Sequence, residues 1–312
     1  MRGEKVFSNR ISSLLLALAV CALWGSLYPF VKLGYDAFSI DGGDVPSIIL
    51  FAGVRFAVCG VAMAVLFSAV KGRLLAPKRE DAAPVFTVAL FSVILHYLLT
   101  YIALAVGEGS KSAIIKQIGF LFLSCMSFLF IKNERFSYKK LFCGCLGFSG
   151  IVVTSMDGSA FSFALGDLLL VLSSFCAVIG TVATKKAVKR TEPLVLVAYS
   201  QLFGGVLLLL AGLAFGGRIA HVDLGSAVVF AYICVASICA YALWNVLIKY
   251  NSVSKLSMIK FTEPLFAVLF SGLLLRENIL KWNYAAAMII IFTVILLDNG
   301  FIRKRRGKGG FK

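Results

Sequence analysis

The chain has 312 residues, of which 60% are hydrophobic and only 15% charged, and its mean hydropathy is +0.93. A soluble domain of this size carries about 25% charged residues on average, so the composition argues against a water-soluble protein. The formal net charge of +16 raises the alternative of a nucleic-acid partner. The distribution of the basic residues along the chain decides between these possibilities.

Apolar residues are grouped in runs of about twenty, the length needed to cross ~30 Å of hydrocarbon. In chain order the ten runs are 11–34, 47–70, 84–106, 112–131, 138–156, 165–185, 193–215, 225–248, 256–275 and 280–298. Backbone groups in lipid must be hydrogen-bonded within a helix or a closed barrel, and the runs lack the alternating period of barrel strands. We therefore expect an all-α membrane protein with ten transmembrane helices.

Basic residues concentrate in alternate segments between these runs. With the N-terminus in the cytoplasm, 23 of the 31 Lys and Arg residues lie on the cytoplasmic side and 4 on the outer side. The positive-inside rule explains this bias, so we expect a multi-pass protein of the cell (inner) membrane with both termini cytoplasmic. Nucleic-acid binding is not expected. The partners are membrane lipids, whose anionic headgroups attract the basic tail, and a small-molecule substrate.

An internal repeat is visible in the sequence. Residues 97–135 align with residues 241–279 at a constant offset of 144, which matches Tyr97 with Tyr241 and Lys116 with Lys260. One repeat holds five helices, an odd number, so the second copy is inserted upside down, as in many transporters with a central binding site. The expected organisation is a cytoplasmic tail at 1–10, five-helix repeats at 11–156 and 157–299, and a basic cytoplasmic tail at 300–312.

Several short motifs recur in a characteristic order. They are Trp24-Gly25-Ser26 followed by Lys32, Arg55-Phe56, Gly166-Asp167, Glu263-Pro264-Leu265, and the acidic turns at Glu134 and Glu277. In these motifs the chain resembles the drug/metabolite transporter superfamily, in particular its EamA-like members, over roughly residues 11–298. The resemblance implies a ten-helix inverted-repeat carrier in which helices 1, 3, 4, 6, 8 and 9 line the cavity. The family transports many kinds of solute, so the resemblance does not name the cargo.

Five charged residues lie within the apolar runs: Lys32, Arg55, Lys116, Lys260 and Glu263. Each costs at least ~2.5–3.5 kcal/mol near the bilayer centre, so each needs a reason to be there. Lys116 and Lys260 each lie ~9 Å from opposite ends of their helices, which favours contacts with an anionic substrate. Glu263 is three residues after Lys260 and can pair with it. The alternative is a structural Lys–Glu pair with snorkelling lysine side chains.

The other two charges lie nearer the outer surface. Lys32 is expected either to reach the cavity or to snorkel to water, and Arg55 to serve in gating or structural pairing. Pro29 and Pro264 each remove a helix hydrogen bond and could act as hinges.

Aromatic and amide side chains form a second candidate set. They recur at helical spacing in the first, third and eighth runs: Trp24, Tyr28, Tyr97, Tyr101, Tyr241, Trp244 and Asn245. Polar-tipped aromatics that face one cavity can stack on a ligand and hydrogen-bond it. A lipid-facing belt is the alternative reading. His96, beside Tyr97, is a weaker candidate for a proton relay.

These features predict a secondary, non-ATP transporter that moves a small organic metabolite by alternating access. The cargo is expected to be anionic or amphipathic, such as an amino acid or a phosphorylated metabolite. A channel-like pore is the alternative, and a lipid flippase or membrane enzyme is less well supported because catalytic motifs are missing. No catalytic residue, cofactor or metal site is expected, and the sequence leaves the oligomeric state open.

Overall fold

The computed structural model describes residues 6–119, 163–260, 262–278 and 281–298, with scattered positions between 120 and 162. Within these residues, six helices are long and apolar enough to cross a membrane: Ile11–Ala37, Val45–Lys71, Arg79–Val106, Leu165–Ala187, Pro193–Ala214 and Leu224–Tyr250. The protein is thus a helical membrane protein. Most of the expected runs at 112–131 and 138–156, Glu134 and the tail at 300–312 lie outside the described residues.

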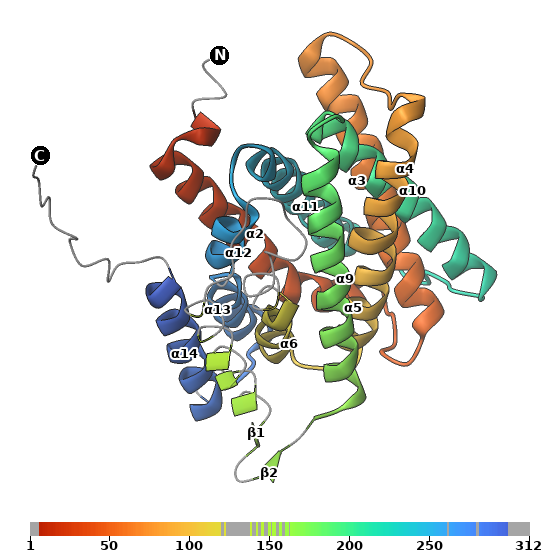
Figure 1. Cartoon of the computed structure of the whole chain (residues 1–312). Helices are drawn as coiled ribbons and strands as arrows, with labels where there is room; N and C mark the ends of the chain where they lie inside the picture. Colours follow the sequence, from red (N-terminus) through yellow and green to blue (C-terminus); the bar gives the residue numbers. More distant parts are fainter. Residues whose placement is uncertain are drawn as a thin grey trace, which may run out of the picture.

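The elements follow one another along the chain as shown in Figure 1. In the first half they are α2 (Arg10–Ala37), α3 (Val45–Lys71), η1 (Arg79–Asp81), α4 (Ala82–Val88), η2 (Ala89–Ile94), α5 (Leu95–Val106) and α6 (Gly109–Ile115). After the antiparallel pair β1 (Met156–Asp157) and β2 (Ala160–Phe161) come α9 (Leu165–Ala187), α10 (Pro193–Ala214), α11 (Leu224–Tyr250), α12 (Val253–Lys260), α13 (Glu263–Leu275) and α14 (Trp282–Asp298). The segment η2 is a single π-helical stretch within the third long helix.

Helix ends coincide with residues that favour them. The side chain of Asn9 accepts hydrogen bonds from the first backbone amides of α2, and Asp44 does the same for α3, where Pro46 occupies the first turn. Gly72 ends α3 with a φ of 60°, a conformation in which glycine has no Cβ penalty. Asp223 caps α11 through the amide of Ser226. These caps satisfy backbone groups that helix termini leave unbonded.

The ninth apolar run departs from expectation. It is not one helix over 256–275 but two, because α12 ends at Lys260 and α13 begins at Glu263. Pro264 lies in the first turn of α13, where its missing N–H costs nothing. Pro264 therefore starts a helix at a break, whereas Pro29 lies inside the continuous helix α2.

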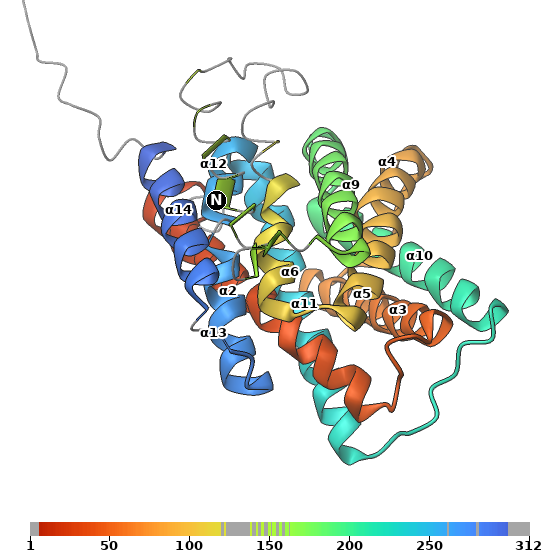
Figure 2. The same ribbon diagram turned by 90° about the horizontal axis from the view of Figure 1, so that it is seen from below.

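Four helix pairs form the body of the molecule: α3 with α10, α2 with α11, α2 with α13, and α5 with α9. Figures 1 and 2 show α9, α5 and α10 on one side of α2 and α11, with α13 and α14 on the other. The pairing of α3 with α10 is antiparallel and very close. A Cβ built on Gly53 would lie 2.2 Å from the backbone N of Leu209, and one on Gly205 would lie 2.2 Å from that of Ala57.

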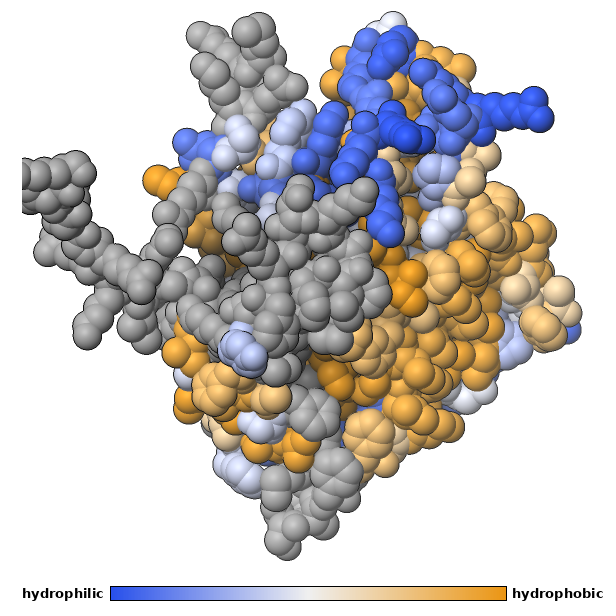
Figure 3. Space-filling view, viewed as in Figure 1, coloured by the Kyte–Doolittle hydropathy of each residue, from blue (hydrophilic) through white to orange (hydrophobic). Residues whose placement is uncertain are grey.

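The surface has an apolar region and a polar region, as expected for a membrane protein. In Figure 3 the hydrophobic side chains form a broad band over the long helices, and the hydrophilic ones gather at one end. That end, here named the basic end, carries the exposed residues Lys71, Arg73, Lys78, Arg79, Lys186, Lys189 and Arg190. It lies beside the α3–α4 and α9–α10 connections (Figure 1).

Candidate functional site

A cavity of about 110 Å³ lies among the long helices, lined by residues from both halves of the chain. The lining includes ten of the eleven residues that the sequence names as substrate contacts: Trp24, Tyr28, Tyr97, Tyr101, Lys116, Tyr241, Trp244, Asn245, Lys260 and Glu263. Arg55, expected to be a gating or structural residue, also lines it. The fold therefore brings ten of the side chains that the sequence pattern singled out to one cavity. The exception is Lys32, described below.

Lys116 lies just after α6, at the wall of the cavity, and is 8% exposed. Its Nζ donates to Thr100 Oγ1 at 3.1 Å and lies 3.4 Å from His96 Nε2. His96 Nδ1 lies 2.9 Å from the carbonyl oxygen of Ser173, so Nδ1 carries the proton and Nε2 presents its lone pair to Lys116. Lys116 is thus held by neutral groups.

Lys260 is the last residue of α12, directly before the break. Its Nζ lies 3.7 Å from Glu263 Oε2, and it sits over the rings of Trp24 and Trp244 at 4.0 Å and 5.4 Å from their centroids. Cation–π contacts at such distances stabilise a buried ammonium. Tyr28 donates to the other carboxylate oxygen of Glu263 at 3.2 Å. The Lys260–Glu263 pair that the sequence predicts is therefore formed.

Gly25 explains how α2 reaches this pair. A Cβ on Gly25 would lie 2.6 Å from Phe266 Cβ and 2.9 Å from the carbonyl oxygen of Glu263. Only glycine allows α2 and α13 to approach so closely. The close contact places Trp24 on Lys260 and Tyr28 on Glu263.

Arg55 on α3 is 1% exposed and fully engaged. Its Nε and Nη2 donate to Ser237 Oγ at 3.2 Å and 2.7 Å, and its Nη1 donates to the hydroxyl of Tyr101. The guanidinium also lies 4.9 Å from the centroid of the Phe56 ring. These bonds join α3, α5 and α11 at the cavity wall, which fits the structural role expected for Arg55 better than a ligand contact.

Two tyrosines at matching positions of the repeat meet in the cavity. The hydroxyls of Tyr97 and Tyr241 are hydrogen-bonded to each other. Trp24 makes edge contacts with Tyr241 and Trp244, with ring centroids 5.5 Å and 5.1 Å apart. The aromatic residues thus form a continuous wall instead of a lipid-facing belt.

Basic side chains outnumber acidic ones on the cavity wall. Among the lining residues that the structure describes, Arg55, Lys116 and Lys260 are basic, and Glu263 is the only carboxylate. A buried basic group needs a counter-ion or hydrogen-bonding partners. Arg55 and Lys116 are hydrogen-bonded to neutral groups, and Lys260 lies beside Glu263.

Lys32 belongs to a different group of residues. Its Nζ donates to the carbonyl of Gly107 at 2.9 Å and lies 3.6 Å from Glu277. Lys32 is not among the residues that line the cavity. Its side chain is 28% exposed, so the alternative, in which Lys32 extends toward water, stays a prediction.

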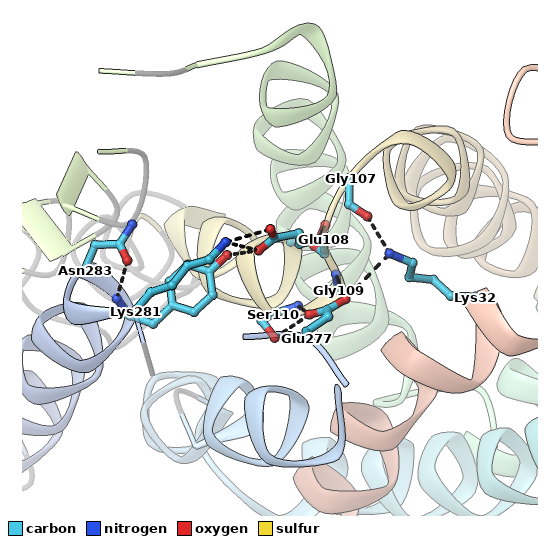
Figure 4. Close-up of polar contacts among 10 residues, drawn as sticks. Lys32, Gly107, Glu108, Gly109, Ser110, Glu277, Lys281 and Asn283 are labelled. Carbon is cyan, nitrogen blue, oxygen red and sulfur yellow. Dashed lines mark hydrogen bonds and ion pairs between the residues drawn. The ribbon is translucent and has the colours of Figure 1, made fainter. Parts of the chain in front are cut away.

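The group around Glu277, here named the Glu277 cluster, joins segments far apart in the chain (Figure 4). Its members are Lys32, Glu108, Gly109, Ser110, Glu277, Lys281 and Tyr284. Glu277 accepts from the backbone amides of Gly109 and Ser110 at 2.9 Å and 3.1 Å and from Ser110 Oγ at 2.7 Å. Glu108 accepts from Lys281 Nζ at 2.7 Å and from the hydroxyl of Tyr284. The cluster closes one end of the bundle between α5, α6 and α14.

Sequence reasoning missed seven polar residues of the cavity: Ser92, Thr100, Gln117, Thr181, Thr184, Ser200 and Gln201. Thr100 accepts a hydrogen bond from Lys116. A usable signal was present for the two amides, since Gln117 and Gln201 are the only glutamines of the chain and both fall in apolar runs. An amide in such a run needs a polar partner just as a charge does.

Comparison with known proteins agrees with these features. An inner membrane transporter of Escherichia coli K12, the uncharacterized YedA, is 25% identical over 90% of this chain and 89% of its own. The uncharacterized transporter YvbV of Bacillus subtilis is 26% identical, covering 92% of this chain and 91% of its own. One crystal structure shares the fold with a TM-score of 0.71 at 18% identity, over 93% of this chain and 97% of the other.

These relatives are named as transporters and not as enzymes. Residues 11–156 and 164–297 match the EamA-like transporter family. The match extends over both the helices that hold Arg55 and those that hold Lys260 and Glu263. The chain belongs to the EamA-like transporter family.

Proposed function

We propose that the protein is a secondary transporter that moves a small organic anion across the cell membrane. The observation that carries this proposal is the composition of the cavity wall, where three basic side chains and one carboxylate lie among the described lining residues. Lys116 is the best anchor for the anion because its bonds are to neutral groups, whereas Lys260 already has Glu263. A carboxylate or phosphate would then complete the site. Amphipathic metabolites fit, since aromatic rings form the rest of the wall.

The protein works by alternating access between two inverted five-helix repeats, at 11–156 and 157–299. Equivalent contacts in the two halves support this arrangement. Lys32 donates to the carbonyl of Gly107, and Lys185 donates to that of Asn251 at 2.7 Å. The two acceptors are 144 residues apart, the offset of the sequence repeat. The hydroxyl contact of Tyr97 with Tyr241 has the same offset.

The basic end is cytoplasmic by the positive-inside rule, and the Glu277 cluster then lies on the outer side. Cavity-lining residues include Thr184 and Ile248, both within three residues of the ends of α9 and α11 at the basic end. Both residues are buried, and Lys185 joins α9 to the end of α11 there through the carbonyls of Ile248 and Asn251. The Glu277 cluster joins the helices at the opposite end. Bonds at both ends support a conformation in which the cavity is occluded.

A thermal-stability screen of the purified protein tests the proposal. A ligand of the folded state raises the melting temperature by mass action. We expect small carboxylates or phosphates to stabilise the wild type and to lose that effect in Lys116→Met. If only neutral or cationic compounds stabilise the protein, or if Lys116→Met responds like the wild type, the anion site is disproved.

Transport and leakage through a pore are separated in proteoliposomes. A carrier that alternates between two states shows saturable counterflow, in which unlabelled solute inside the vesicle accelerates uptake of labelled solute. A pore shows none. Uptake that rises linearly with solute concentration and ignores the internal solute would favour the pore.

A further inference from the structure

Gln201 on α10 lines the cavity and is 1% exposed. Neither its Nε2 nor its Oε1 has a hydrogen-bond partner among the residues that the structure describes. Two other polar side chains of the cavity, Ser200 and Asn245, are hydrogen-bonded within the protein. Ser200 Oγ donates to the carbonyl of Leu196 at 2.7 Å, and Asn245 Nδ2 donates to that of Tyr241 at 2.9 Å.

A buried amide with no partner at either atom is rare and costly, because both the donor and the acceptor have lost water. Gln117 shows a weaker form of the same feature. Its Nε2 donates to the carbonyl of Ala113 at 3.1 Å, while its Oε1 is unbonded within the described chain. Both glutamines of the protein therefore bring unused hydrogen-bonding groups to one cavity.

Arg55, on the neighbouring helix α3, is satisfied within the protein. All three of its side-chain nitrogens donate to Ser237 or Tyr101. Gln201 differs from it because neither of its polar atoms has a partner among the described residues.

We propose that Gln201 determines substrate specificity by binding an uncharged hydroxyl or amide group of the substrate. This inference rests on the proposed function, in which Lys116 holds the anionic group. A hydroxyl both donates and accepts, as a side-chain amide does, so the two satisfy each other. The substrate class is then an organic anion that also carries a neutral polar group, such as a hydroxy acid or a hydroxylated phosphate ester.

The test uses matched ligand pairs that differ by one hydroxyl: malate with succinate, lactate with propionate, and glycerol 3-phosphate with propyl phosphate. Affinities come from thermal shift at several ligand concentrations on the wild type, Gln201→Met and Ser200→Ala. We expect the wild type to prefer the hydroxylated member of at least one pair by about tenfold, the size of one buried hydrogen bond. Gln201→Met should lose that preference and keep its affinity for the other member. Ser200→Ala should keep the preference.

The melting temperature without ligand separates this role from a structural one. Methionine has nearly the volume of glutamine and no unbonded polar atoms, so Gln201→Met should melt at the wild-type temperature or above it. A lower melting temperature, or failure to fold, would show that the amide has a structural partner and would overturn the proposal. Equal affinity of the wild type for both members of every pair, or a preference retained in Gln201→Met, would overturn it as well. If no anion binds the wild type at all, the proposed function fails first, and that result is distinct from a lost hydroxyl preference.

Discussion

The close packing of α3 against α10 gives a prediction whose size follows from the structure. The seam contains Gly53 and Gly60 on α3 and Gly205 and Gly212 on α10, each with backbone of the other helix against it. In Gly205→Ala the new Cβ would lie 2.2 Å from Ala57 N and 2.6 Å from Phe56 C, whereas ordinary contact begins at 3.4 Å. The helices must therefore separate by about 1.2 Å, the difference between 3.4 Å and 2.2 Å.

Overpacking of this kind costs about 1–3 kcal/mol, and loosening the neighbouring contacts adds to it. Replacing glycine by alanine in a helix gains about 0.5–1 kcal/mol in return, so we expect a net loss of about 1–2 kcal/mol in the free energy of unfolding. The assay is denaturant or thermal unfolding of the detergent-solubilised protein.

Gly225→Ala is the matched control. Gly225 lies in the first turn of α11, and its nearest atom to a new Cβ is Asp223 Oδ1 at 3.5 Å. This variant should be as stable as the wild type or slightly more stable. The packing argument is refuted if Gly205→Ala and Gly225→Ala unfold at the same denaturant concentration.

Three further predictions concern the bonds around the cavity. Arg55→Gln removes charged hydrogen bonds to Ser237 and Tyr101 and should lower the free energy of unfolding by about 1.5–3 kcal/mol; a melting temperature equal to that of the wild type would contradict the structural role. Glu277→Gln should weaken the contacts of the Glu277 cluster that close the outer end. A cysteine placed at Leu104, which is 3% exposed, should then react faster with a membrane-impermeant maleimide than it does without Glu277→Gln. An unchanged labelling rate would contradict the role of the cluster as an outer closure. Partial burial opposes ionisation of Glu108, but bonds from Lys281 and Tyr284 outweigh it and lower its pKa. A lowered carboxyl pKa stabilises the folded state above the unfolded pKa, and this contribution is lost as the pH falls through the folded pKa. The difference in melting temperature between the wild type and Glu108→Gln should therefore shrink below about pH 4.5, and it is small because Glu108 is partly exposed; a difference that grows on acidification would refute the sign.

The sequence predicted the long helices well because their signal is strong and local. A run such as 47–70 is apolar enough to exclude other structures, and α3 covers Val45–Lys71. At Pro264 the sequence predicts a hinge within one helix, whereas the structure has two separate helices, α12 and α13. A hydropathy profile does not reveal a break between two helices when the residues on both sides of it are apolar. The π-helical stretch Ala89–Ile94 carries no sequence signal that would distinguish it from the α-helix around it.

The sequence identified part of the cavity lining, and it did so for a physical reason. Charged and polar-tipped aromatic residues in lipid-length runs must face one another or a cavity, and this logic found Lys116, Lys260 and Glu263. It failed for Lys32, whose depth in the helix resembles that of a cavity residue. The carbonyl of Gly107 and the carboxylate of Glu277 that hold it come from distant segments, so only the fold reveals them. For the same reason, the sequence could not show that His96 and Thr100 of α5 contact Lys116.

The most direct test of the anion carrier is counterflow in proteoliposomes with matched variants. Labelled anions that stabilise the purified protein are presented outside vesicles that contain the same unlabelled anion, using the wild type, Lys116→Met and Gly225→Ala. The account predicts saturable counterflow for the wild type and Gly225→Ala, and its loss in Lys116→Met. Counterflow by Lys116→Met at the wild-type rate would contradict the account.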